Sequence, residues 1–171
     1  AEGLGEIICK APNVMLGYTK DEFNEEVFHD GWFYTGDLGY KDDDGVFYIK
    51  GRKKNVIVLK NGKNVYPEEL EDLLVKALPE VNELLVFGWE KDDDLLVSAN
   101  FVVDQALIDE MGEDKLKQRL LDAVTEINAT LPPYKLIRRL LLSTEAMEKT
   151  STQKVRRPRV VPELQKRTDY F

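Results

Sequence analysis

The sequence of 171 residues predicts an α+β fold, in which a small β-rich subdomain precedes a compact C-terminal domain with a hairpin and a short mixed or antiparallel sheet packed by helices. Residues 1–50 contain short runs of aromatic and β-branched side chains, which are typical of strands. From residue 51 onward, strand-like runs alternate with two segments whose apolar residues repeat at helical spacing. The composition changes from aromatic to basic at residues 50–52, so we place the domain boundary between residues 50 and 51.

The N-terminal part contains the weaker patterns. Residues 5–9 alternate as a strand does, and residues 21–28 are compatible with a short helix. Two short aromatic strands, 31–34 and 46–49, flank an acidic turn at 42–45. Asp37 follows the first of these strands, and we expect its carboxylate to protrude from a tight turn.

A hairpin and a helix are expected in the stretch that begins at residue 51. The run 56–58 is β-branched, Asn61-Gly62 is a strong hairpin signal, and residues 64–66 read as the returning strand. Pro67 suits the first position of a helix over 68–78, whose first turn is acidic. The apolar stripe of this helix consists of Leu70, Leu73, Leu74, Ala77 and Leu78.

The rest of the chain predicts a small sheet and one long helix. Strands 83–88 and 95–103 surround a turn at 90–94 and are expected to pair antiparallel. The segment 113–131 has the most regular helical stripe, and it ends before a Pro-Pro pair that cannot continue a helix. Residues 136–142 read as a short strand. The Ser/Thr-rich approach to Lys154 has no apolar period, so we expect an exposed, mobile loop.

The composition excludes several classes of protein. Hydrophobic residues make up 43% of the chain and charged residues 33%, as in ordinary globular domains. A net charge of −8 argues against a general nucleic-acid surface, although the region around Lys154 is locally basic. Cys9 is the only cysteine, which fits a reducing compartment, so we expect the cytoplasm. No apolar run approaches the roughly 20 residues that span a bilayer.

Three stretches, in this order, resemble the C-terminal part of the adenylate-forming (AMP-binding) acyl-CoA synthetases. They are Gly-Trp-Phe-Tyr-Thr-Gly-Asp-Leu-Gly-Tyr at 31–40, the stretch 51–71 with its Gly-Arg start, and Glu-Lys-Thr-Ser-Thr-Gln-Lys-Val-Arg-Arg at 148–157. The form Thr-Ser-Thr-Gln-Lys is most similar to bacterial long-chain fatty-acid CoA ligases. The resemblance implies that residues 1–50 are the last β subdomain of the large AMP-binding domain and residues 51–171 the mobile C-terminal domain. The chain would then be about the last third of an enzyme.

The resemblance also implies a reaction. An acid–thiol ligase of this family converts a carboxylate, here a fatty acid, and ATP into an acyl-adenylate and pyrophosphate, and then forms a thioester with CoA and releases AMP. ATP or AMP, CoA and Mg²⁺ are the implied cofactors, and the sequence has no cluster of metal ligands, so Mg²⁺ would arrive with ATP. The N-terminal domain of the same enzyme is the implied partner, and no nucleic acid is expected. Since the phosphate loop and the acyl pocket are missing, we expect this chain to be inactive alone.

By resemblance, Asp37 holds the ribose 2′- and 3′-hydroxyls, Arg52 lies near the nucleotide and Lys54 is the hinge about which the C-terminal domain rotates. A carboxylate can accept hydrogen bonds from two vicinal hydroxyls, and a guanidinium offers a fork of donors. Without the resemblance, Asp37 would be an ordinary turn residue and Arg52 a solvated linker residue.

Lys154 is the implied catalytic residue, because an ammonium can stabilise the charge that develops on the α-phosphate during adenylation. Gln153 stands where the family usually has glycine. The alternative is a solvated basic tail, which would comprise Lys149, Lys154, Arg156, Arg157 and Arg159. The hairpin residues Asn61, Gly62 and Lys63 would enter the active site in the second half-reaction and line the pantetheine tunnel, or would simply form a turn.

Two other functions stay open at this point. One is an adenylation unit that loads a carrier protein, although only 17 residues follow Lys154, without a carrier-like domain. The other is a non-catalytic module whose basic cluster binds an anionic partner, which salt-sensitive binding of RNA or an acidic peptide would indicate.

Overall fold

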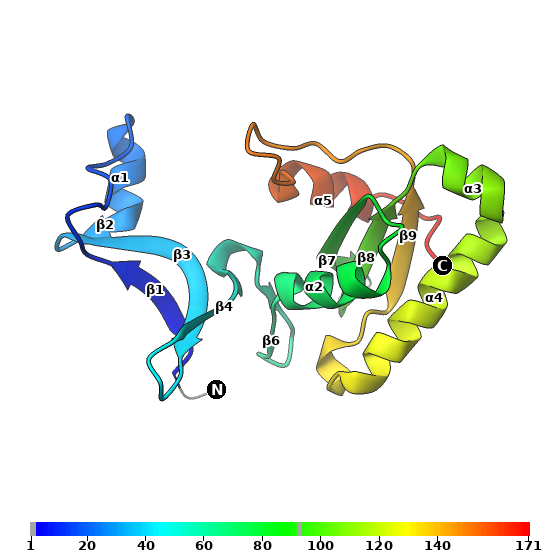
Figure 1. The fold of residues 1–171 in the computed structure, drawn as a ribbon, viewed down its shortest axis with the longest axis horizontal. Helices are drawn as coiled ribbons and strands as arrows, with labels where there is room; N and C mark the ends of the chain where they lie inside the picture. The colour runs from blue at the N-terminus through cyan, green and yellow to red at the C-terminus, as the bar shows by residue number, and fades with distance from the viewer. Residues whose placement is uncertain (1–2, 92–93) are drawn as a thin grey trace. The chain divides into compact units, whose positions relative to one another are not determined.

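A computed structural model describes residues 3–91 and 94–171 and confirms the α+β fold class (Figure 1). The chain divides into two compact units, Ala1–Val56 and Ile57–Phe171, which we call unit 1 and unit 2. The boundary between the units thus follows residue 56, and the segment 51–52, where we placed the domain boundary, continues a strand. Among the described residues, no helix has both the length and the apolar character that crossing a bilayer requires.

Unit 1 is an antiparallel sheet built around one long strand. The strand β3 (Trp32–Lys41) pairs with β1 (Gly5–Cys9), β2 (Phe28–His29) and β4 (Phe47–Arg52). The helix α1 (Asp21–Val27) precedes β2. These elements confirm the strands and the short helix that the sequence predicts in this part of the chain.

The prediction of a tight turn at Asp37 is wrong, because β3 continues through this residue as a strand of ten residues. Gly36 has a φ of +74°, and residues 34–38 of β3 lie opposite residues 6–8 of β1. This is a bulge, in which extra residues are accommodated without ending the strand. The two glycines that flank Asp37 therefore resemble a turn in the sequence but form a kink in a strand.

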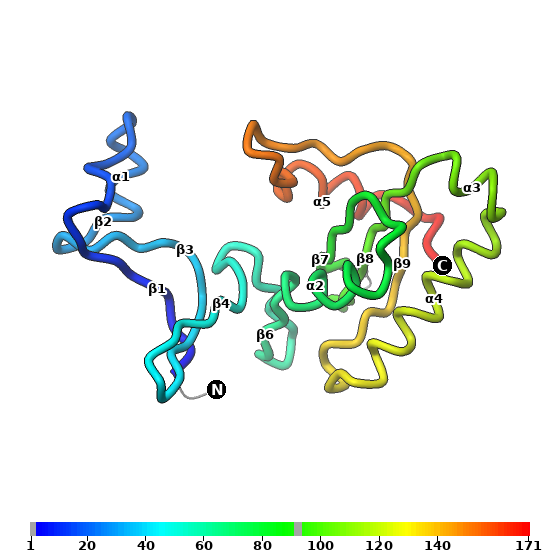
Figure 2. Tube along the Cα trace, in the orientation of Figure 1, coloured from blue at the N-terminus to red at the C-terminus, as the bar shows by residue number. Residues whose placement is uncertain are grey.

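Unit 2 begins with the predicted hairpin and helix. The strands β5 (Ile57–Val58) and β6 (Asn64–Val65) pair antiparallel, and α2 (Pro67–Ala77) follows directly. Leu70 and Leu74 are buried, as the stripe predicts, whereas Leu73 is exposed. Figure 2 shows the hairpin and this helix as consecutive green segments.

A mixed sheet forms the centre of unit 2. Its order is β7 (Glu83–Lys91), β8 (Asp94–Val102), β9 (Arg139–Ser143), with an antiparallel β7–β8 pair and a parallel β8–β9 pair. The predicted turn between β7 and β8 includes residues 92–93, which lie outside the described residues. The 3-10 helix η2 (Pro133–Lys135) leads into β9.

Helices cover both faces of this sheet. Alternate side chains of a strand point to opposite faces, so Val86 and Leu85 belong to two different cores. Val86 packs with the buried stripes of α2 and of α4 (Glu113–Thr130), which confirms the predicted long helix. Leu85 packs with Leu164 of α5 (Arg157–Gln165) and with Met147. The helices α5 and α3 (Gln105–Met111) are not predicted by the sequence patterns above.

Candidate functional site

Asp37 and Arg52 lie opposite each other on β3 and β4. The Nε of Arg52 is 3.0 Å from Oδ1 of Asp37, and its Nη1 donates to the carbonyl of Thr35 at 2.7 Å. Arg52 therefore makes contacts on both sides of the bulge and is not a free linker side chain. The pair presents a partly exposed carboxylate whose direction is set by the neighbouring guanidinium.

The bulge itself is supported from β1. The hydroxyl of Thr35 donates to the carbonyl of Ile7 at 2.8 Å and accepts the amide of Asp37 at 3.0 Å. The amide of Gly36 donates to Glu6, which also pairs with Lys53 at 2.8 Å. The hydrogen bond from Lys53 lowers the pKa of the Glu6 carboxyl below its usual value. These contacts hold the backbone at Asp37 in one conformation.

Lys54 lies in the 3-10 helix η1 (Lys53–Asn55), two residues before the boundary between the units. Its side chain is 90% exposed and pairs with Glu26 at 3.5 Å, within unit 1. An exposed pair of this kind contributes little to stability. Lys53, next to it, is anchored to β1 through Glu6, whose side chain is only 16% exposed.

Asn61, Gly62 and Lys63 form the end of the β5–β6 hairpin. The amide of Gly62 donates to the carbonyl of Leu59 at 2.8 Å, and the amide of Leu59 donates to Lys63 at 2.9 Å. Gly62 has a φ of +75°, and Oδ1 of Asn61 accepts the amide of Lys63. This is a type I turn followed by a left-handed residue, one of the common hairpin geometries. The Asn-Gly pair thus predicts the hairpin, although only the glycine is left-handed.

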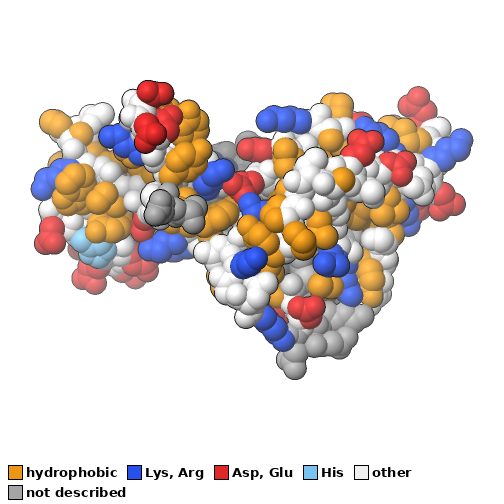
Figure 3. Space-filling view, turned by 90° about the horizontal axis from the view of Figure 1, so that it is seen from below, with side chains coloured by type: hydrophobic (Ala, Val, Ile, Leu, Met, Phe, Trp, Pro, Cys, Tyr) orange, Lys and Arg blue, Asp and Glu red, His pale blue; other side chains and the backbone are white. Residues whose placement is uncertain are grey.

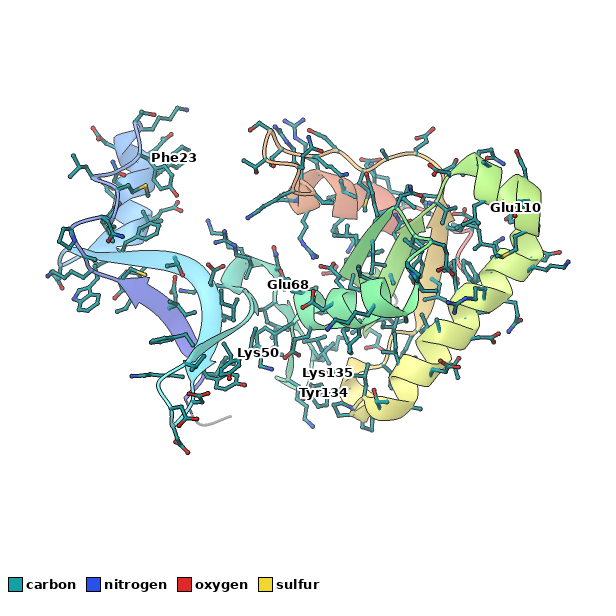
Figure 4. The ribbon with its side chains drawn as sticks, viewed as in Figure 1. Phe23, Lys50, Glu68, Glu110, Tyr134 and Lys135 are labelled. Atoms are coloured by element: carbon teal, nitrogen blue, oxygen red, sulfur yellow. The ribbon has the colours of Figure 1, made fainter. Side chains whose placement is uncertain are left out.

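A cavity of about 690 Å³ adjoins this hairpin within unit 2. The ammonium of Lys63 lies 4.5 Å from the ring centre of Tyr134, which, like Lys135, belongs to η2 (Figure 4). Lys60 and Arg138 add two further cations to the lining, and Asp94 adds one carboxylate. The cavity is therefore predominantly cationic and has an aromatic face, a combination that suits an anionic ligand.

Lys154 lies on a second hairpin of the same geometry. Lys149 and Val155 form a bridge, the amide of Thr150 donates to the carbonyl of Lys154 at 2.8 Å, and the amide of Gln153 donates to Thr150 at 3.0 Å. Gln153 has a φ of +61° and occupies the left-handed position that Gly62 occupies in the first hairpin. The segment is exposed, as expected, and its backbone forms a hydrogen-bonded turn at the end of which Lys154 is exposed.

The basic residues around Lys154 form ion pairs. Each of the other four is paired with a carboxylate: Lys149 with Glu83 at 2.5 Å, Arg157 with Glu71 at 2.6 Å, and Arg156 and Arg159 with Glu148 at 3.5 and 3.2 Å. For Lys154, no ion pair is found within residues 3–91 and 94–171. Four of the five cations are therefore paired with three carboxylates, and Lys154 is exposed, as is the paired Arg159, whose side chain is 68% exposed.

The sequence patterns do not indicate the role of Arg157. Its side chain is only 17% exposed, and it donates to both oxygens of Glu71 and to the carbonyl of Val86. Burial raises the pKa of the Glu71 carboxyl, while Arg157 and the Val86 amide oppose that rise. Pro158, together with the apolar spacing of Val160 and Leu164, was the available signal that a helix begins here.

The structure brings only some of the candidate residues together. Asp37 and Arg52 form one pair in unit 1. Asn61, Gly62 and Lys63 share one hairpin of unit 2, and Lys154 lies on another.

Known proteins with similar sequences are CoA ligases. A 2-succinylbenzoate–CoA ligase of Bacillus licheniformis is 41% identical over 118 residues, which is 66% of this chain and 24% of that ligase. A long-chain-fatty-acid–CoA ligase of Bacillus subtilis is 36% identical over 152 residues, which is 82% of this chain and 27% of that ligase. The chain thus spans about a quarter of the length of these relatives.

Similar structures lead to the same family. The O-succinylbenzoate coenzyme A synthetase of Bacillus subtilis, in complex with AMP, superimposes with a TM-score of 0.72 and 31% identity, over 93% of this chain and 30% of the synthetase. The profile of the AMP-binding enzyme C-terminal domain matches residues 54–170, which is most of unit 2. The chain therefore belongs to the family of AMP-binding enzyme C-terminal domains, and it resembles adenylate-forming acyl-CoA synthetases over nearly its whole length.

Proposed function

We propose that this chain is the C-terminal part of an AMP-forming acid–thiol ligase, which activates a carboxylic acid with ATP and transfers the acyl group to CoA. The observation that carries the proposal is Lys154: an exposed ammonium on an ordered hairpin, among basic residues that are otherwise paired. The similarity to two CoA ligases supports the reaction class. The chain alone is expected to release no pyrophosphate, because the remainder of the site would lie outside it.

Unit 1 would contribute to nucleotide binding. The carboxylate of Asp37 is partly exposed and can accept hydrogen bonds from two neighbouring ribose hydroxyls. Arg52 holds one of its oxygens and thereby orients the other toward a ligand. This arrangement fits a ribose better than a phosphate, because the nearest charge to a ligand would be the carboxylate.

Lys154 would act in adenylation. Negative charge builds up on the α-phosphate and on the bridging oxygen as the acid attacks, and a positioned ammonium stabilises that charge more in the transition state than in the ground state. Lys154 moves no proton in this scheme. Mg²⁺ would be bound mainly by the phosphates of ATP, as is usual for this ion.

The first hairpin would act in thioester formation. Gly62 has no side chain and no atom within 4 Å of the place where a Cβ would be, so the backbone is accessible to a passing thiol chain. Lys63 borders the cationic cavity, whose charge suits the phosphates of CoA. Lys54 would supply the backbone rotation that exchanges the two hairpins between the half-reactions.

The proposal is tested by Lys154→Ala in the complete enzyme. We expect adenylation, measured as pyrophosphate release, to fall by roughly 10²–10³ with little change in ATP affinity, the scale of losing one preorganised electrostatic donor. Thioester formation from preformed acyl-adenylate should be retained. Lys166→Ala, which removes an exposed lysine of a surface pair, is the control. A wild-type rate of pyrophosphate release in Lys154→Ala would overturn the proposal.

The identity of the acid that the enzyme activates is a separate part of the proposal. We favour a long-chain fatty acid, on the form of the Lys154 segment, with 2-succinylbenzoate as the second candidate, since similar relatives carry both names. A panel of acids assayed with the complete enzyme separates them. Replacing CoA with a carrier protein in the same assay tests the carrier-loading alternative. Salt-sensitive binding of RNA or an acidic peptide tests the anionic-partner alternative, against which the pairing of four of the basic residues with carboxylates counts.

A further inference from the structure

Two carboxylates of unit 2 lie at the two ends of the Lys154 hairpin. Glu83, the first residue of β7, contacts the segment that leads into the hairpin, and its side chain is 12% exposed. Its Oε1 is 2.5 Å from Nζ of Lys149, and its Oε2 accepts the amide of Met147 at 2.8 Å. Both oxygens of one carboxylate therefore bind the segment that leads into the hairpin.

Glu71 of α2 fastens the other end. Arg157, the first residue of α5, donates through Nη2 to both oxygens of Glu71 at 2.6 and 2.7 Å, and through Nη1 to the carbonyl of Val86 at 2.7 Å. The amide of Val86 donates in turn to Glu71 at 2.7 Å. The residue that leaves the hairpin is thus bound to α2 and β7 at once.

Hydrogen bonds also join the two sides of the hairpin between these anchors. The amide of Arg156 donates to the carbonyl of Glu148 at 2.8 Å, and the hydroxyl of Thr150 accepts the amide of Lys154 at 3.2 Å. Met147 is buried against the sheet face that α5 covers. In Figure 1 the orange segment runs from β9 to the start of α5 and turns back at its far end.

We propose that Glu83 and Glu71 are positioning residues for Lys154: they fix both ends of its hairpin to β7 and α2, so that the lysine moves with unit 2 as one body. The inference rests on the proposed function only for what Lys154 does. A charged side chain on a free loop loses conformational entropy when it is ordered in the transition state. A hairpin that is anchored at both ends has already lost that entropy on folding, so the same step costs less. Loosening either end of the hairpin should therefore lower the adenylation rate, although the ammonium of Lys154 is still present.

The first test needs no activity. In the 171-residue chain, Glu83→Ala removes both acceptors, and Lys149→Met removes the cation while keeping an apolar stem. We expect the amide of Thr150 to exchange with solvent about tenfold or more faster in both variants, while core amides such as that of Leu120 keep their protection. Glu163→Gln, which breaks a pair on the exposed face of α5, is the control. Unchanged exchange at Thr150 in both variants would overturn the inference.

The second test uses the complete enzyme and compares Glu83→Gln with Lys154→Ala. We expect Glu83→Gln to lower the adenylation kcat about tenfold with KM for ATP unchanged, and to cause no further loss when added to Lys154→Ala, because both changes act through one ammonium. Additive losses in the double variant would contradict the positioning role. If Lys154→Ala itself has no effect while Thr150 exchange responds as expected, the proposed function fails and the anchoring of the hairpin stands.

Discussion

The contacts of Arg157 show that one residue of the basic run 156–159 is buried and its neighbours are at the surface, which the sequence alone does not reveal. Arg156 and Arg159 are at least two-fifths exposed and share one carboxylate, as surface residues do, whereas Arg157 between them is mostly buried. A guanidinium offers five donors in a plane, and three of its hydrogen bonds here reach Glu71 and Val86. Because the partners lie 71 and 86 residues earlier in the chain, no local pattern could have indicated them.

The stability of unit 2 should depend strongly on this residue. Removing one member of a buried pair leaves the other charge without compensation, so we expect Arg157→Ala to lower the free energy of unfolding by about 3–5 kcal/mol. Arg159→Ala, at an exposed pair, should change it by no more than about 1 kcal/mol. Urea unfolding of the two variants and the wild type measures both values. Equal, small losses would show that the Arg157 pair is not buried in solution.

The same variant should acquire a pH dependence. Burial already raises the pKa of Glu71, and Arg157→Ala removes the charge and the hydrogen bonds that oppose this rise. Above the unfolded-state pKa, a folded carboxyl with a raised pKa binds more protons than the unfolded one, so the free energy of unfolding falls as pH rises toward the folded pKa. The deficit of Arg157→Ala should thus be larger at about pH 8 than at about pH 5. Adding Glu71→Gln should abolish this difference, and a deficit that does not change with pH would contradict it.

At the scale of elements, the sequence predicts what local patterns encode. The helix α4 is predicted to within one residue, because its stripe is regular and Pro132 ends it. The helix α5 is short and contains Pro162, so its pattern is weak. It begins in a basic segment whose contacts are with residues far away in the sequence. The strand β3 was cut short because its bulge uses glycine, as a turn does. Of the candidate site, the residue types were predictable, but the pairing of Asp37 with Arg52 depends on the register of β3 and β4.

The two hairpins share one turn geometry but differ at its left-handed position. Gly62 fills that position in the β5–β6 hairpin and Gln153 fills it in the Lys154 hairpin. A left-handed conformation costs a residue with a Cβ about 1–2 kcal/mol, so the Lys154 hairpin includes a local strain that the first one avoids. Contacts through Glu83 and Glu71 hold the residues on either side of this hairpin.

The first hairpin allows a test of backbone conformation without steric conflict. A Cβ at Gly62 would meet no atom within 4 Å, so the cost of Gly62→Ala comes from its φ of +75° alone. We expect a loss of about 1 kcal/mol in urea unfolding of the chain. Gly62→Asn is the matched variant, since asparagine tolerates the left-handed region, and it should lose less. Equal losses of stability for alanine and asparagine would show that the left-handed backbone conformation is not what makes glycine favourable at this position.

At the scale of the molecule, the two units differ in how they bury apolar surface. Among the described residues, every hydrophobic side chain of the buried core belongs to unit 2. In unit 1, Phe47 is 61% and Ile49 66% exposed, and Figure 3 shows apolar side chains at the surface among the charged ones. Exposed apolar groups of this size suit contact with further protein. Unit 1 therefore exposes apolar surface, whereas unit 2 has a core of its own.

The backbone between the units is anchored on both sides of a short segment. Lys53 is anchored through Glu6 in unit 1, and Ile57 is buried in the core of unit 2, so residues 54–56 are the segment where a rotation would occur. Proline fixes φ, and Lys54→Pro should therefore restrict that rotation. In the complete enzyme we expect thioester formation to slow more than adenylation, because in the proposed scheme only thioester formation needs the Gly62 hairpin to replace the Lys154 hairpin in the site. Single-turnover measurements of pyrophosphate release and of acyl-CoA formation separate the two steps. Glu26→Gln, which removes the partner of Lys54 without constraining the backbone, should affect neither step, and equal slowing of both steps by Lys54→Pro would refute the hinge.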